Sequence, residues 1–422
     1  MKSVLAIFLV LLCFFQSVPP LYATPEETPP EIRGEAAYLI DVQSGQTLYS
    51  KNGDKLLAPA STTKIMTGLL AIEQGNLNEV VTASPTMLNY KIVYGTRIYM
   101  EPGEQLLLGD MLYALLLNSA NDAAVAIAEH IGGSLPQFVT LMNQRAQELG
   151  LKDTTFKNPS GLSEEGHQTT AHDLARIAQA AYSNPIFRDY IKTKTHVIPR
   201  SKENVPFEMI NENKLLWQDS MITGMKTGYT AAAGNCLVAS ASKGGRDLIA
   251  VILKSPGREI YKDMLDLLDF GFNNFENTMY KPLGDSISKI QVRNQDVNLV
   301  AQEPIWITKK KEALPLDSNI IGQLNPQIKI LPVTSDLTEV VAGQVLTQLE
   351  VWEGDERISV IPLSADRTVA PEPQLPKSIS RLPYLLILLA GGLLFSLKLR
   401  KTLTLRHINR TRSKQEKSRM RE

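Results

Sequence analysis

A serine and a lysine three residues apart could supply a nucleophile and its base. Ser61 and Lys64 have this i, i+3 spacing, which on a helix places both side chains on one face. A serine hydroxyl becomes a strong nucleophile when a base within hydrogen-bonding reach takes its proton. The pattern alone is weak, because the same S-x-x-K string recurs at 240–243 and 286–289. Acyl transfer through Ser61 is therefore a hypothesis that needs further motifs.

Two further strings strengthen the hypothesis by their order and their settings. The sequence Ser-Ala-Asn at 119–121 lies between two predicted helices, and Lys-Thr-Gly at 226–228 lies on a predicted strand. The string at 61–64 opens a predicted helix. All three settings fit one cleft, and the three strings in this order are the motif set of penicillin-binding proteins and β-lactamases.

The elements that must position these motifs predict an α+β layered domain over 35–276. A hairpin is expected at 36–49, and three adjacent strands are expected at 220–230, 235–242 and 247–253. A sheet built from both ends of a segment, with helices from its middle, gives a layered domain. The predicted helices cover 61–73, 109–117, 121–132, 135–148, 172–182 and 258–275.

Three segments resemble the low-molecular-weight penicillin-binding D-Ala-D-Ala carboxypeptidases. They are LAPASTTKIMT at 57–67, PSGL at 159–162 and GYT at 228–230. The resemblance implies a β-lactamase/transpeptidase-like catalytic domain, with an antiparallel sheet and a helical domain. It also implies hydrolysis of the terminal D-Ala-D-Ala bond of peptidoglycan stem pentapeptides, which releases D-alanine and limits cross-linking. β-Lactam antibiotics would be covalent inhibitors, and no cofactor is expected.

Carried onto this sequence, the resemblance assigns catalysis to Ser61, Lys64 and Ser119. Ser61 would attack the D-Ala-D-Ala carbonyl while Lys64, unprotonated in its cleft, accepts the proton. Ser119 would relay a proton to the leaving amine of D-alanine. Asn121 would hold the substrate backbone, and Lys226 would support the proton network. Water would then hydrolyse the acyl-enzyme.

The resemblance also implies a substrate-binding set. Backbone N–H groups of Ser61 and Tyr229 would form the oxyanion hole, usually the largest electrostatic contribution in acyl transfer. Thr227 and Arg258 would bind the terminal carboxylate. Many relatives have His in place of Tyr229 and some have Arg in place of Glu212, so carboxylate recognition rests more heavily on Arg258. The substrate-binding residues are then Asn121, Lys226, Thr227, Gly228, Tyr229 and Arg258.

The N-terminal 34 residues are predicted to comprise a signal peptide for export and a short lead-in. Residues 1–23 combine Lys2, an apolar run at 4–15 and an LYA exit at 21–23, which is typical of a secretory signal peptide. A buried first helix is the weaker alternative. Residues 24–34 are predicted to be a disordered lead-in, because 24–30 is rich in Pro, Thr and Glu.

The C-terminal third predicts a second domain and an anchor. Short alternating stretches in 280–369 indicate a small all-β domain, and three prolines make 370–381 a stiff linker. Segment 382–397 has no charged residue and is predicted to be a transmembrane helix. The tail 398–422 has ten basic and two acidic residues, so the positive-inside rule places it in the cytoplasm and the bulk of the chain outside. Nucleic acid is not an expected partner.

Several conspicuous residues are expected to be structural. With five histidines and neither an H-E-x-x-H string nor a cysteine cluster, no metal site is predicted, and His167 and His172 are assigned to capping or core hydrogen bonds. Glu164 and Glu165 are interpreted as solvated loop charges. Cys236 lies in an apolar strand and is interpreted as a buried small hydrophobe.

Rival functions use the same cleft or none. A β-lactamase would need rapid deacylation, and a DD-transpeptidase or DD-endopeptidase would differ only in the acceptor or in the bond cut. A non-catalytic wall-binding or penicillin-sensing module would have no use for a nucleophile with its base. The sequence leaves open the third residue of the stem peptide, the oligomeric state, the role of the β domain, and vegetative versus sporulation use.

Overall fold

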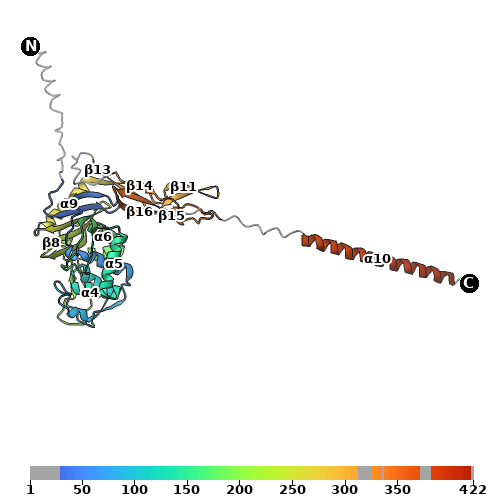
Figure 1. Cartoon of the computed structure of the whole chain (residues 1–422), viewed down its shortest axis with the longest axis horizontal. Coiled ribbons are helices and arrows are strands. Elements are labelled where there is room, and N and C mark those ends of the chain that lie inside the picture. The colour runs from blue at the N-terminus through green and yellow to red at the C-terminus, as the bar shows by residue number, and fades with distance from the viewer. Residues whose placement is uncertain (1–28, 312–324, 334–336, 371–381, 420–422) are drawn as a thin grey trace, which may run out of the picture.

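The structure is a computed structural model that describes residues 29–311, 325–333, 337–370 and 382–419 of the 422-residue chain. The predicted signal peptide lies outside the described residues, as does nearly all of the predicted proline linker. Figure 1 shows the catalytic body with a β-rich extension on the side of α9 and β13, away from α4.

A five-stranded antiparallel sheet forms the centre of the catalytic body, in the order β2-β1-β9-β8-β7. The first and last strands of the sequence segment pair directly, so the sheet closes the domain from both ends. Its strands are β1 (Ala36–Asp41), β2 (Thr47–Lys51), β7 (Ile222–Thr230), β8 (Gly234–Lys243) and β9 (Arg246–Ser255).

Strand β9 is a continuous apolar run because both of its faces are covered. Leu248, Ala250 and Ile252 join the core cluster that contains helix α9 (Ile260–Asn274). The alternate residues Ile249, Val251 and Leu253 join the cluster on the opposite face, which contains the helical region. A strand alternates its side chains between two faces, so the sheet separates two cores.

Helices pack on the second of these faces. Some of them start at side-chain caps: Ser134 accepts a hydrogen bond from the N–H of Gln137, and Thr170 accepts one from the N–H of Asp173. The helices are α2 (Lys64–Gln74), α3 (Leu108–Leu116), α4 (Asn121–Gly132), α5 (Leu135–Glu148), α6 (Ala171–Ser183) and α7 (Pro185–Lys192). Helix α8 (Leu215–Gln218) instead packs into the core on the α9 side through Leu215 and Leu216. Short elements connect them: η1 (Ala60–Thr63), η2 (Pro85–Leu88), β3 (Val80–Thr82), β4 (Gln105–Leu107), β5 (Thr195–Val197) and β6 (Glu208–Ile210).

The C-terminal strands form a β module with its own core. Five of them make an antiparallel sheet in the order β11-β12-β16-β15-β14, and β10 pairs with β13 beside it. Leu299, Leu349, Ile361 and Leu363 are among its buried residues. The strands are β10 (Phe275–Lys281), β11 (Ser286–Val292), β12 (Gln295–Ala301), β13 (Ile305–Lys310), β14 (Gln327–Ile330), β15 (Val345–Glu353) and β16 (Glu356–Ala365).

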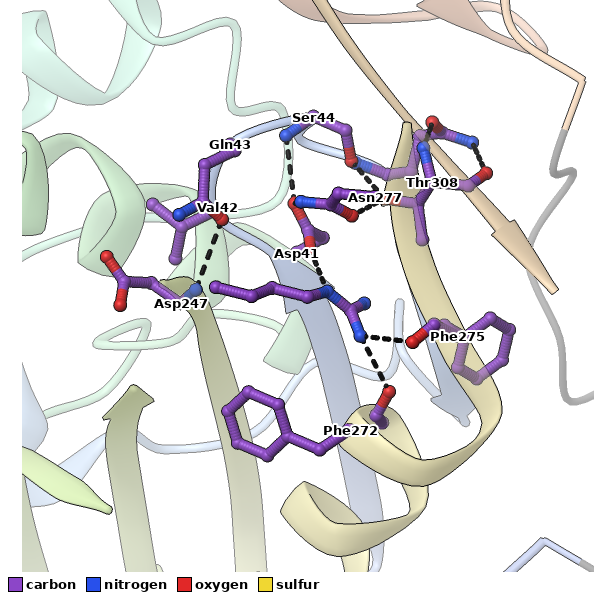
Figure 2. Close-up of polar contacts among 12 residues, drawn as sticks. Asp41, Val42, Gln43, Ser44, Asp247, Phe272, Phe275, Asn277 and Thr308 are labelled. Atoms are coloured by element: carbon purple, nitrogen blue, oxygen red, sulfur yellow. Dashed lines mark hydrogen bonds and ion pairs between the residues drawn. The ribbon is translucent and has the colours of Figure 1, made fainter. Parts of the chain in front are cut away.

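One buried polar network joins the catalytic body to the β module (Figure 2). Asp41, at the end of β1, accepts hydrogen bonds from Arg246 Nε at 2.6 Å and from Asn277 Nδ2 at 2.9 Å. Thr308 Oγ1 donates to Asn277 Oδ1 at 2.9 Å and lies 2.6 Å from Ser44 Oγ. The network therefore ties β1 and β9 to β10 and β13.

A second network lies where the β15–β16 turn meets α6. Glu356 forms ion pairs with Arg176 Nε at 2.7 Å and His172 Nε2 at 2.8 Å. Arg176 also donates to the carbonyl of Gly45, whose positive φ of 74° shapes the β1–β2 turn. A Cβ at Gly45 would lie 2.6 Å from the carbonyl oxygen of Ile358, so only glycine fits this contact.

The predicted transmembrane helix is not confirmed. Segment 382–397 belongs to a longer helix, α10 (Leu382–Arg419). Among the helices of the described chain, none is both long enough and apolar enough to cross a membrane.

Candidate active site

Ser61 lies at the turn that leads into α2. It belongs to the 3-10 helix η1, and Lys64 is the first residue of α2, so the helix begins slightly later than predicted. Lys64 Nζ lies 3.0 Å from Ser61 Oγ. Ala60 before Ser61 has a positive φ of 50°, a conformation that is costly for a residue with a Cβ and that recurs at functional sites. The first motif thus brings its two side chains into contact.

Lys64 is completely buried and has no carboxylate within ion-pairing distance in the described chain. Its Nζ lies 2.7 Å from Asn121 Oδ1 and 2.7 Å from the carbonyl oxygen of Ser160. Burial, followed by repulsion from Lys226, holds the pKa of Lys64 well below its usual value, and weaker attraction to Glu212 and Asp122 opposes the shift. Lys64 can therefore lose its proton far more easily than a surface lysine.

The second motif occupies the turn between α3 and α4. Ser119 is buried and has a positive φ of 59°, which turns the chain so that Asn121 begins α4. The side chain of Asn121 contacts Lys64 through Oδ1 and donates from Nδ2 to the carbonyl of Tyr94 at 2.5 Å. Asn121 therefore joins the first motif to the 94–96 loop, which it also contacts through its backbone N–H and the carbonyl of Thr96.

The third motif lies on β7, beside Ser61. Lys226 is 1% exposed, and burial lowers its pKa, with attraction to Glu212 opposing the shift. A Cβ at Gly228 would lie 2.9 Å from the backbone nitrogen of Ser61, so glycine permits the close approach of β7 to the nucleophile. Tyr229 follows with its side chain 66% exposed. Three strings far apart in sequence therefore meet around Ser61 and Lys64.

Glu212 contacts the third motif, whereas Arg258 does not. Glu212 Oε2 lies 3.8 Å from Lys226 Nζ and accepts a hydrogen bond from Thr227 Oγ1 at 3.3 Å. Arg258 lies just before α9, and its side chain is exposed. Within the described chain, no hydrogen bond or ion pair connects it to the other predicted site residues.

The segment 158–167 contains contacts that the sequence did not reveal. The carbonyl of Ser160 faces Lys64, and Gly161 packs so tightly that a Cβ would lie 1.8 Å from the carbonyl oxygen of Ala60. His167 is buried, its Nε2 lies 2.9 Å from Thr63 Oγ1, and its Nδ1 accepts from the N–H of Lys157. The PSGL string was a usable signal for this segment, although it gave no role to the Ser160 carbonyl.

Several residues that were expected to have structural roles lie outside the catalytic contacts or in the core. Ser240 is fully buried in β8 and accepts a hydrogen bond from Thr223, and the other repeated string lies on β11 of the β module. Cys236 is buried, which confirms its interpretation as a small hydrophobe. The core hydrogen bonds of His167 are likewise confirmed. The described residues include no cluster of three or more His, Cys, Asp or Glu side chains that could hold a metal ion.

Comparisons with known proteins identify the family of this chain. The family model described as D-alanyl-D-alanine carboxypeptidase matches residues 23–257. The D-alanyl-D-alanine carboxypeptidase DacF of Bacillus subtilis is 36% identical over 320 residues, which cover 74% of this chain and 82% of the relative. DacC of Escherichia coli, with the same description, is 33% identical over 74% of this chain and 76% of its own length.

Two solved structures extend the comparison to the fold. Penicillin binding protein 5 from Haemophilus influenzae has a TM-score of 0.64 at 29% identity, covering 82% of this chain and 99% of that one. The Streptomyces K15 DD-transpeptidase has a TM-score of 0.55 at 31% identity, covering 58% of this chain and all of that one. The family and the mixed α/β penicillin-binding fold expected from the three motifs are confirmed. The chain therefore belongs to the D-alanyl-D-alanine carboxypeptidase family of serine peptidases.

Proposed function

We propose that this enzyme removes the terminal D-alanine from peptidoglycan stem peptides that end in D-Ala-D-Ala, through an acyl-enzyme on Ser61. The observation that carries the proposal is the contact between Ser61 Oγ and Lys64 Nζ at 3.0 Å, with Lys64 buried and free of any close carboxylate in the described chain. A nucleophile in contact with a base of lowered pKa is the arrangement that acyl transfer requires.

The surroundings of Lys64 support a general base. A neutral amine has two N–H donors and one lone pair. The two nearest acceptors, Asn121 Oδ1 and the Ser160 carbonyl, can take the two N–H bonds. The lone pair is then left for the hydroxyl proton of Ser61. In this arrangement Ser61 Oγ attacks the carbonyl carbon of the penultimate D-alanine as its proton passes to Lys64.

The remaining residues act in the two steps of the reaction, acylation of Ser61 and hydrolysis of the acyl-enzyme. Backbone N–H groups of Ser61 and Tyr229 stabilise the oxyanion, consistent with the close approach of β7 to the nucleophile. Ser119 passes a proton to the departing amine, with Lys226 nearby on β7. The C–N bond breaks and D-alanine leaves. Water then attacks the Ser61 ester, gives its proton to the base, and releases the shortened peptide.

Thr227 and Arg258 bind the terminal carboxylate, and Asn121 holds the substrate backbone. Thr227 is supported by its position on the strand that faces Ser61. Arg258 must move its exposed side chain towards Thr227 when substrate binds. β-Lactams, which imitate the acyl-D-Ala-D-Ala bond, acylate the same serine.

Penicillin labelling combined with D-alanine release tests the proposal. The wild-type protein should release D-alanine from a D-Ala-D-Ala-terminated peptide, and labelled penicillin should map to Ser61. Ser61→Ala should abolish both. Ser240→Ala and Ser286→Ala are matched controls, because both serines begin an S-x-x-K string and should leave labelling intact. Label that maps to Ser240 or Ser286 would overturn the assignment, and slow release of the bound penicillin would exclude a β-lactamase.

We also propose that the enzyme is exported and tethered to the membrane by α10. Support comes from large apolar side chains that are exposed along 386–397, and from the ten basic residues that follow in the sequence. In this proposal the catalytic body, the β module and the linker are successive extracytoplasmic units. A protein spanning residues 24–376 should be soluble and active, whereas the full chain should sediment with membranes. Full-length protein that stays in the supernatant would contradict the tether.

A further inference from the structure

Glu212 is built into the wall of the cleft. Its N–H donates to the carbonyl of Leu117 at 3.1 Å, two residues before Ser119. The neighbouring Asn211 is buried and donates from Nδ2 to the carbonyls of Ile191 and Thr193, both at 3.1 Å. The backbone on this side of Glu212 is therefore fixed between the second motif and α7, and its side chain extends towards β7.

The carboxylate of Glu212 already contacts part of the predicted anion site. Its Oε2 accepts a hydrogen bond from Thr227 Oγ1 at 3.3 Å and lies 3.8 Å from Lys226 Nζ. Under the proposed function, Thr227 also receives the terminal carboxylate of the substrate. Two carboxylates at one hydroxyl would repel each other, and the side chain of Glu212, which is 42% exposed, is free to swing towards solvent.

Glu212 also acts on the catalytic lysines. Burial and Lys226 lower the pKa of Lys64, and Glu212 is the larger of the two groups that oppose this shift, Asp122 on α4 being the other. On the opposite side, burial raises the pKa of Tyr261 on α9, with a further increase from Glu212 and a decrease from Arg258. Glu212 is therefore a negative charge between the base and the predicted carboxylate ligand.

We propose that Glu212 is a specificity-determining residue, an internal carboxylate that occupies the anion subsite of the free enzyme and must be displaced by the terminal carboxylate of the substrate. The inference rests on the proposed function of the same site. Displacing the Glu212 carboxylate costs free energy, so it weakens the binding of peptides that end in a free carboxylate. The binding of peptides that end in a neutral amide is weakened less.

The test compares Glu212→Gln with Glu208→Gln, a control that removes an exposed glutamate from the nearby strand β6. Two peptides are used, one ending in D-Ala-D-Ala and one in D-Ala-D-alaninamide. In Glu212→Gln we expect KM for the acid to fall about three- to tenfold, the range for one partly screened charge contact, with a much smaller change for the amide. Glu208→Gln should match wild type for both peptides.

The pH dependence provides a second readout. Because Glu212 opposes the lowering of the Lys64 pKa, its removal should move the acidic limb of penicillin acylation to lower pH. A purely structural role would not move this limb. Thermal melting confirms that both variants fold.

Different results would contradict the proposed function and the inference about Glu212. A wild-type enzyme that releases no D-alanine contradicts the function, and the acylation profile still tests Glu212 in that case. An active wild-type enzyme contradicts the inference if Glu212→Gln keeps the wild-type acid-to-amide ratio. It is also contradicted if KM for the acid rises, since that result would make Glu212 a support for Lys226 and not a competitor of the substrate.

Discussion

The catalytic cleft and the junction with the β module both bury charged groups, but they treat them differently. In the cleft, Lys64 and Lys226 are almost completely buried, and the closest carboxylate oxygen among the described residues is 3.8 Å from Lys226 Nζ. At the junction, Arg246 contacts Asp41 at 2.6 Å and Arg176 contacts Glu356 at 2.7 Å. One region leaves buried cations poorly compensated, and the other pairs them closely.

Two histidines only five residues apart, one beside the cleft and one at the junction, show the same difference in their pKa values. Burial lowers the pKa of His167, beside the cleft, to about 4. At the junction, burial also acts to lower the pKa of His172, but contacts with Asp173 and Glu356 outweigh it and raise the pKa to about 9. Neighbouring carboxylates therefore decide which buried histidine is charged at neutral pH.

The comparison teaches that a buried charge without a close partner is available for chemistry, whereas a paired one fixes structure. Lys64 can act as a base because, among the described residues, no carboxylate lies within ion-pairing distance of its Nζ, and burial and Lys226 together lower its pKa. Arg246 and Arg176 instead hold the two β-rich parts in one orientation, at a position where loss of either partner would leave a buried charge. Substitutions in the two regions should therefore affect different measurements.

The largest effect is expected from Lys64→Arg. Arginine keeps the positive charge but stays protonated in any protein setting, so it cannot act as a base. General-base catalysis contributes about 10²–10⁴-fold, and penicillin acylation should fall by at least that order. Because a permanently charged arginine at this fully buried position also costs stability, acylation is compared on the folded fraction of each protein. Acylation within about tenfold of wild type, a loss of only ~1.4 kcal/mol, would show that Lys64 is an electrostatic residue and that the base lies elsewhere.

Arg246→Met should do the opposite, with a large loss of stability and little loss of chemistry. The change leaves Asp41 buried and without its ion-pair partner, which typically costs about 3–5 kcal/mol. Urea unfolding monitors the loss, and penicillin acylation of the folded fraction should stay close to wild type. Lys262→Ala removes an exposed pair with Asp266 and serves as the control, with an expected cost below about 1 kcal/mol. Equal costs for the two variants would remove the distinction between buried and surface pairs.

Much of this architecture follows from local patterns in the sequence. The strand patterns, the helical spacing of apolar residues and the glycine-marked turns at 44–45 and 354–355 were all predictable, because each depends on a few neighbouring residues. The contact between these two turns was not. It depends on Glu356, Arg176 and the exact fit of Gly45 against Ile358, which are brought together only by the fold.

The candidate site shows the same limit. Motif order was enough to group Ser61, Lys64, Asn121 and Lys226, since each motif carries a recognisable side chain. A backbone carbonyl has no sequence signature, so the contact between Ser160 and Lys64 could not be predicted. Glu212 appeared only as a departure from the family pattern, and its contact with Thr227 required the structure.

A smaller effect is expected from His172→Gln, and it should depend on pH. The pKa of His172 is about 9 in the folded protein, against an ordinary value of 6.5. Its contribution to stability is therefore complete below about pH 6.5 and disappears as the pH rises through about 9. The variant should lose roughly 1.5–3 kcal/mol at pH 6, the range for hydrogen bonds to charged groups, and much less at pH 10. A pH-independent loss would mean that the imidazole acts by packing alone.

The smallest perturbation leaves the sequence intact and follows the two imidazoles by NMR. His167 has a pKa of about 4, below its ordinary value, so the folded protein takes up its proton less readily than the unfolded chain. Stability linked to His167 is therefore complete above about pH 6.5 and is lost as the pH falls towards 4, the reverse of His172. The His172 ring signals should shift near pH 9, and those of His167 should stay constant from pH 9 down to about 5. Loss of His172 in the variant above identifies its signals. If both rings titrate together near pH 6.5, the carboxylates at the junction do not control protonation and the contrast between the two regions fails.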